Sequence, residues 1–310
     1  MLEHFLVVAG QVATLFLLMG IGFFLGKTNR LSLAGTGEMS FLLMYIVTPC
    51  IIVDSFQTDW EGDTLHTLAV GTAALTVCYG VYILISLFLF RKKPADLQAP
   101  LRFGCVYGNT GFMGLPLVRA VLGEKALIFA VVSMVVFNIL CWTHGVILMG
   151  GKSAFSPRKI VLNPGVIAVA VGLPLFLLRV RLPGPLYNAV GFVGDLNTPL
   201  AMVVIGAQMS RADLINTFRG KELYAASAVK LLLMPTITAL LLLPLRLDPL
   251  FYSATVILAA APTAGITSMF AEQFGRDSAR AAQLVSLSTL LSIFTLPVAG
   301  VAAQILSGLH

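Results

Sequence analysis

The sequence GNTGFMGLP at residues 108–116 interrupts a hydrophobic segment, and APTAGIT at residues 261–267 interrupts another at the matching place in the second half of the chain. Such breaks expose backbone N–H and C=O groups that lipid cannot satisfy, so they are stable only inside protein or along a water-filled cavity. Matching interrupted segments in two halves are typical of the binding site of secondary transporters. The pair therefore predicts an all-α membrane protein that carries a solute.

The composition supports a membrane protein. Of the 310 residues, 58% are hydrophobic and 11% are charged, and the mean hydropathy is +0.93. Soluble domains carry about 25% charged residues. The net charge of +6 comes from short scattered loops and not from one basic stripe, so we expect the lipid bilayer as a partner and no nucleic acid.

No motif predicts an enzyme. The chain has no HExxH, P-loop or GxSxG sequence, and we expect no metal and no other cofactor. The four cysteines lie in apolar runs without CxxC spacing, which indicates packing residues. The first apolar run, residues 5–26, is too long for a signal-peptide core and is expected to remain as a span.

The hydrophobic segments predict ten membrane spans, since a span needs about 20 apolar residues. Lys and Arg concentrate in the loops on one side, which predicts a multi-pass plasma-membrane protein with both termini outside. The predicted spans are 5–26, 38–57, 64–90, 99–122, 125–150, 161–180, 186–209, 220–245, 249–274 and 280–307.

Ten spans divide into two halves of five, residues 1–150 and residues 151–310, whose equivalent spans run in opposite directions. That arrangement is an inverted repeat. Traces of it remain in the sequence: Thr48-Pro49 corresponds to Thr198-Pro199, and Thr110 corresponds to Thr263.

The pattern Asn-Thr-x-x-Met-Gly-x-Pro-Leu at residues 109–117 resembles the fourth-span signature of the auxin efflux carrier family. The ninth span resembles the family's second signature through Pro262, Gly265-Ile266 and Phe270-Ala271-Glu272. The resemblance covers essentially the whole chain.

This resemblance implies a ten-span fold with two crossing discontinuous helices. It also implies elevator-type transport, with a scaffold of spans 1, 2, 6 and 7, a moving transport domain of spans 3–5 and 8–10, and a homodimer formed through the scaffold. Family members export or exchange small organic anions, such as auxin in plants and malonate or malate in bacteria. The short loop at residues 151–160 and the lack of ionisable residues inside span 3 favour a bacterial-type permease.

The crossing itself predicts an anion site. Each second half-helix begins near mid-membrane, where its N-terminus presents free N–H groups and about half a positive charge. Two such ends bind an anion without a fixed cation. Asn109 is expected to donate its amide to a carboxylate, and Thr110 and Thr263 to add hydroxyl groups. The predicted substrate-binding residues are Asn109, Thr110, Gly111, Gly114, Pro116, Pro262, Thr263, Gly265 and Thr267.

The same residues also have simpler, purely structural interpretations. The glycines and prolines could only kink packed helices, and the threonines could bond their own helix backbone. Asp195 and Lys230 lie within spans and are interpreted as an ion pair, either structural or coupled to protons. His144 is interpreted as a hydrogen-bonded packing residue. Arg119, near a span end, is expected to snorkel to the interface.

Two other functions fit the same sequence. In a sodium-coupled symporter, hydroxyls and unwound carbonyls near Thr110, Thr263, Thr267 and Ser268 would coordinate Na⁺. A channel or membrane sensor would bind without substrate turnover. We rank the organic-anion carrier first, the symporter second and the channel or sensor third.

Overall fold

A computed structural model of the chain describes residues 2–58, 64–212 and 217–308. These residues are helical throughout, apart from loops and one isolated antiparallel bridge between Gly108 and Thr263. The helices are α1 (Leu2–Lys27), α2 (Leu33–Leu42), α3 (Thr48–Ser55), α4 (Thr64–Phe88), α5 (Ala95–Val106), α6 (Leu115–Leu122), α7 (Leu127–Leu140), α8 (Val146–Gly150), α9 (Pro157–Val161), α10 (Pro164–Leu177), α11 (Gly184–Asp195), α12 (Asn197–Met209), α14 (Lys221–Ala228), α15 (Met234–Leu242), α16 (Pro249–Ala260), α17 (Ile266–Gln273) and α18 (Ser278–Ser307).

Several of these helices continue one another through single wide turns of π-helix. A proline follows three of these turns by two residues: Pro49 after η1 (Leu43–Val47), Pro116 after η2 (Thr110–Gly114) and Pro235 after η6 (Val229–Leu233). Proline has no N–H for the preceding turn and its ring crowds the carbonyl four residues earlier. A local widening accommodates both effects, and π turns often occur at functional sites.

Seven helical stretches are long and apolar enough to cross a membrane, and three shorter apolar helices accompany them. The structure thus confirms an all-helical, multi-pass membrane protein. The seven are Val8–Lys27, Leu33–Ser55, Thr64–Phe88, Glu124–Gly150, Gly184–Met209, Lys221–Leu245 and Ser278–Ser307; the three are Thr110–Leu122, Pro164–Leu177 and Pro249–Ala260.

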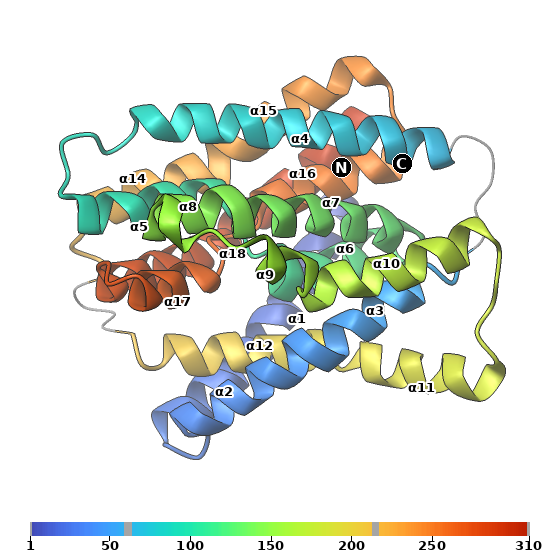
Figure 1. The fold of residues 1–310 in the computed structure, drawn as a ribbon, viewed down its shortest axis with the longest axis horizontal. Coiled ribbons are helices and arrows are strands. Elements are labelled where there is room, and N and C mark those ends of the chain that lie inside the picture. The colour runs from blue at the N-terminus through green and yellow to red at the C-terminus, as the bar shows by residue number, and fades with distance from the viewer. Residues whose placement is uncertain (1, 59–63, 213–216, 309–310) are drawn as a thin grey trace.

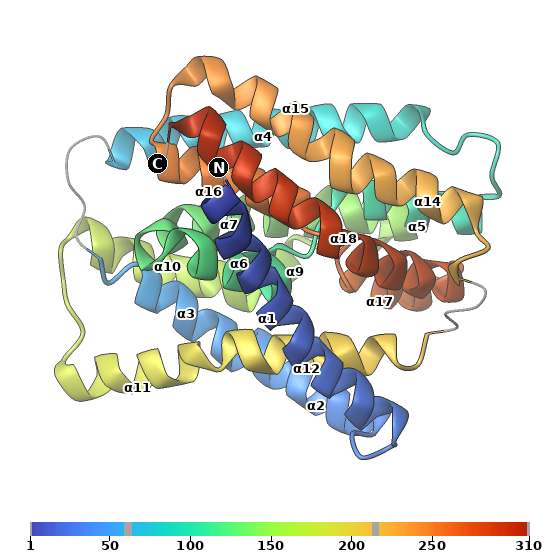
Figure 2. The ribbon, with the colours of Figure 1, turned by 180° about the vertical axis from the view of Figure 1, so that it is seen from behind.

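The helices form two layers (Figure 1). Helices α2, α3, α11 and α12 make one layer, with α1 lying across α12 and α10 packing on α3. Helices α4 to α8 and α14 to α18 make the other layer, in which α14 and α15 lie far from α12. Figure 2 shows the second layer from behind, with the two chain termini close together.

The backbones of α1 and α12 approach each other closely where glycines meet. A Cβ atom added to Gly22 would collide with the backbone of Val203, and one added to Gly206 would collide with the carbonyl of Met19. Small residues permit such close helix contacts in membranes. Helix α1 therefore packs closely against α12.

We expect the substitution Gly206→Ala to destabilise the protein by about 1–3 kcal/mol, because the added methyl group must push α1 away from α12. The matched control is Gly20→Ala, on the same helix pair, where a Cβ atom meets nothing within 4 Å. Thermal unfolding in detergent measures both variants. Equal melting temperatures for the two would contradict the close packing.

Candidate functional site

The two helix breaks meet backbone to backbone. The first lies between α5 and η2, and the second between α16 and α17. The N–H of Asn109 donates to the carbonyl of Pro262 at 2.6 Å, and the N–H of Ala264 donates to the carbonyl of Tyr107 at 3.0 Å. Each break therefore satisfies exposed backbone groups of the other, as backbone at membrane depth requires.

Thr263 fixes this crossing to its surroundings. Its fully buried hydroxyl donates to the carbonyl of Gly104 in α5 at 3.0 Å, and its N–H donates to Ser288 Oγ in α18 at 3.1 Å. The hydroxyl predicted to contact substrate is thus engaged in holding the two breaks together. The sequence analysis did not predict this role of Ser288. The signal available in the sequence was the cluster of hydroxyl residues in α18, all of them buried in the structure: Ser286, Ser288, Thr289 and Ser292.

Asn109 caps the helix that begins after the first break. Its Oδ1 accepts the N–H of Phe112 at 3.3 Å, which is the role of an N-cap residue. The side-chain amide carries two further N–H donors on Nδ2. Within the described residues no acceptor is seen for these N–H groups, while the oxygen of the same side chain holds the helix start.

The two half-helix N-termini face the first layer. Turn η2 packs against α12, and at the start of α17 the nearest atom to a Cβ built on Gly265 is Gln208 Oε1 of α12, at 3.7 Å. Gly265 is partly exposed, and the N–H groups of Gly265 and Ile266 donate to no other described residue. The space between the crossing and α12 thus combines free backbone donors with an exposed glutamine side chain.

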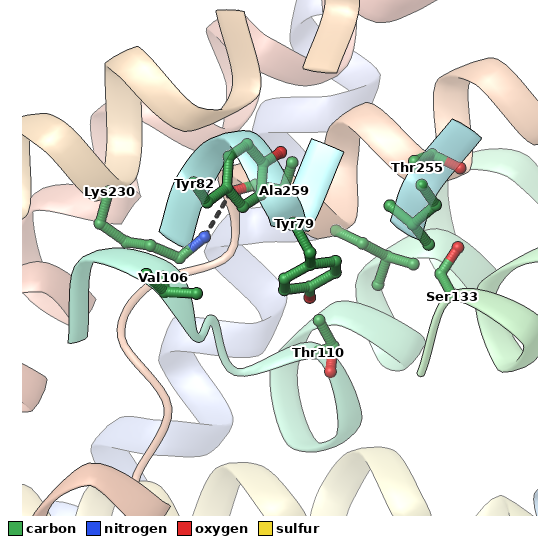
Figure 3. Close-up of a pocket in the computed structure, with 10 residues that line it drawn as sticks. Tyr79, Tyr82, Val106, Thr110, Ser133, Lys230, Thr255 and Ala259 are labelled. Carbon is green, nitrogen blue, oxygen red and sulfur yellow. Dashed lines mark hydrogen bonds between the residues drawn. The ribbon is translucent and has the colours of Figure 1, made fainter. Parts of the chain in front are cut away.

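Two of the predicted hydroxyls are buried without a hydrogen-bond partner among the described residues, those of Thr110 and Thr267. Thr110 also lines a small internal cavity of about 10 Å³ together with Tyr79 and Lys230 (Figure 3). That volume is close to what one water molecule needs.

Three predicted site residues serve mainly in packing or in the backbone. A Cβ atom on Gly114 would collide with Leu258 of α16, and Pro116 is buried at the start of α6. The buried Pro262 contributes the carbonyl that accepts from Asn109. Gly111, in contrast, is partly exposed beside Asn109.

The ion pair expected between Asp195 and Lys230 is wrong. Asp195 Oδ1 lies 2.7 Å from Arg119 Nη2, and its side chain is 59% exposed, whereas Lys230 is 1% exposed and donates to the carbonyl of Ala259 at 2.6 Å. Asp195 ends α11 in the first layer, and Lys230 is enclosed within the second. Arg119, which also binds Glu124 at 2.6 Å, therefore joins the two layers and does not simply snorkel.

His144 packs beside the crossing, as predicted for a single histidine within a span. Its Nδ1 lies 3.0 Å from the hydroxyl of Tyr107, which itself donates to the carbonyl of Leu140 at 2.9 Å. These bonds orient the ring of Tyr107, whose backbone carbonyl accepts from Ala264.

Many apolar helices around a buried crossing of two broken helices define a membrane transporter. The model of the family described as "Membrane transport protein" matches residues 7–156 and 152–299. The chain belongs to this family, which confirms its resemblance to the auxin efflux carriers.

Two relatives cover nearly the whole chain. One, from Rhizobium meliloti (strain 1021), is named "Putative malonate transporter" and is 25% identical over 301 residues, covering 93% of each chain. Another, from Methanothermobacter thermautotrophicus, is named "Uncharacterized transporter" and is 24% identical over 298 residues, covering 92% of this chain and 95% of the relative.

We expect Thr263→Val to destabilise the protein by about 1–3 kcal/mol, because it removes the hydroxyl that donates to the buried carbonyl of Gly104. The matched control is Thr267→Val, which removes an equally buried hydroxyl for which the described part of the chain offers no partner. Thermal unfolding should show the control at or above wild-type stability. A larger loss in the control than in Thr263→Val would contradict the described crossing.

Proposed function

We propose that the chain is a secondary carrier of small organic anions, with malonate-like dicarboxylates as the first substrates to test. The observation that carries this proposal is the pair of half-helix N-termini at one crossing, of which η2 packs against α12 and the start of α17 lies beside Gln208 of α12. At the second of them the N–H groups of Gly265 and Ile266 donate to no other described residue. Helix N-termini attract anions through their partial positive charge and their N–H donors. The name of the Rhizobium meliloti relative supports a dicarboxylate.

The two layers support an elevator-type mechanism. The scaffold would comprise α1 to α3 and α10 to α12, and the transport domain would comprise α4 to α8 and α14 to α18, in a ten-span fold of two inverted repeats. The salt bridge between Arg119 and Asp195 connects these two units. During alternating access the transport domain slides along the scaffold, so this exposed bridge would break in one state and form in the other.

The loop charges support an orientation in the bacterial inner membrane with both termini on the extracytoplasmic side. An inside-negative potential then favours export of an anion. We propose a homodimer through the scaffold as the assembled form.

A sodium-coupled symporter is the second candidate. The observation that favours it is the pair of buried hydroxyls without partners, those of Thr110 and Thr267, since oxygen atoms near unwound backbone coordinate Na⁺ in related architectures. Sodium dependence of substrate affinity separates the two candidates.

We expect Asn109→Asp to weaken malonate binding and exchange at least about tenfold while leaving stability nearly unchanged, because a lost hydrogen bond to a charged group costs about 1.5–3 kcal/mol. Aspartate keeps the oxygen that caps Phe112, but it replaces the amide donor with a negative charge. Counterflow of radiolabelled malonate and malate in proteoliposomes, with and without sodium and pH gradients, measures exchange.

The matched control is Asn163→Asp. Asn163 caps α10 by the same bond, with Oδ1 accepting the N–H of Gly165 at 2.9 Å, and it lies outside the crossing. Its variant should exchange malonate at the wild-type rate. Normal exchange by Asn109→Asp would remove Asn109 from the site, and exchange that requires sodium would favour the symporter.

A further inference from the structure

A fully buried lysine lies directly behind the crossing. The side chain of Lys230, in η6, is enclosed by the second layer, and its Nζ donates to the carbonyl of Ala259 at 2.6 Å (Figure 3). Among the described residues, no carboxylate forms a salt bridge with it. A charge on a buried amine is costly unless opposite charges or hydrogen bonds compensate it.

The ammonium touches the first break itself. A Cβ atom on Gly108 would lie 2.7 Å from Lys230 Cε and 2.8 Å from Nζ, so a larger residue at position 108 would displace the end of this lysine. Gly108 directly precedes Asn109, the predicted substrate donor. The same cavity that Lys230 lines also includes Thr110, whose hydroxyl has no partner among the described residues. Only the backbone of the first break therefore separates Lys230 from the proposed anion site.

The surroundings of Lys230 are the negative ends of two half-helices. Ala259 is in the last turn of α16, and α5 ends at Val106, which lines the same cavity. The C-terminal end of a helix carries about half a negative charge. The lysine is in η6, between α14 and α15, whereas η2 packs against α12. Helices α14 and α15 lie far from α12 (Figure 1), so the lysine and the N-terminal end of the first half-helix are on opposite sides of the crossing.

We infer that Lys230 is the fixed cation of the crossing, a positioning residue whose charge draws an anionic substrate to the half-helix N-termini on the other side of the backbone. This inference rests on the proposed function and adds the source of anion selectivity to it. The carbonyl ends of the two half-helices offset the ammonium charge locally, and the same charge favours a carboxylate at the N-terminal ends across the backbone.

The test compares Lys230→Met, Lys230→Gln and Lys230→Arg with the control Lys221→Met, which makes the same change at an exposed position of the same span. Radioligand binding with malonate and thermal shifts with malonate, malate, acetate and nitrate are measured on purified protein. We expect the Met and Gln variants to lose about tenfold or more in malonate affinity, with a smaller loss for acetate because it carries one charge. The Arg variant should bind better than the Gln variant, and the control should match the wild type.

The Gln variant separates charge from structure. Glutamine keeps an N–H donor toward the carbonyl of Ala259, so it carries the test if the Met variant does not fold. A folded Met or Gln variant with wild-type malonate affinity would overturn the inference and leave the proposed function standing. A wild-type protein whose melting temperature responds to none of the four anions would overturn both.

Discussion

The structure depends on one constraint, the hydrogen bonding of backbone at membrane depth. Where α5 and α16 stop, lipid offers no partner to the exposed N–H and C=O groups, and each break supplies partners to the other. The bonds from Asn109 to Pro262 and from Ala264 to Tyr107 make the two breaks one unit. Thr263 ties that unit to α5 and α18. Once these groups are satisfied, the next N–H groups, at Gly265 and Ile266, donate to no other described residue.

This arrangement also separates charge across the crossing. The carbonyl ends of two half-helices face Lys230 in the second layer, and the N-terminal ends face α12 in the first. A polar site is therefore built mainly from backbone, which suits a membrane protein with few charged residues. We propose that specificity then depends on a small number of side chains, chiefly the amide of Asn109 and the charge of Lys230. The exposed Gln208 of α12 supplies a polar group from the facing layer.

The sequence was sufficient for the helical class, the hydrophobic segments and the positions of both breaks, because apolar length and Gly or Pro residues act locally. The place of Asn109 at the first break also followed from the sequence, and its role toward a substrate stays a prediction. The contacts of Thr263, Asp195 and Lys230 could not be predicted, since they depend on which helix faces meet. Asp195 was paired with Lys230 from their depth in the spans alone. The structure instead places Asp195 beside Arg119 and leaves Lys230 at the crossing.

The proposed anion site at the crossing is best tested by an experimental structure of the wild-type protein with bound malonate, determined in lipid nanodiscs. We expect malonate density between the crossing and α12, within hydrogen-bond distance of the Asn109 amide and the N–H of Gly265. Malonate density at another place, with the crossing empty, would contradict this site.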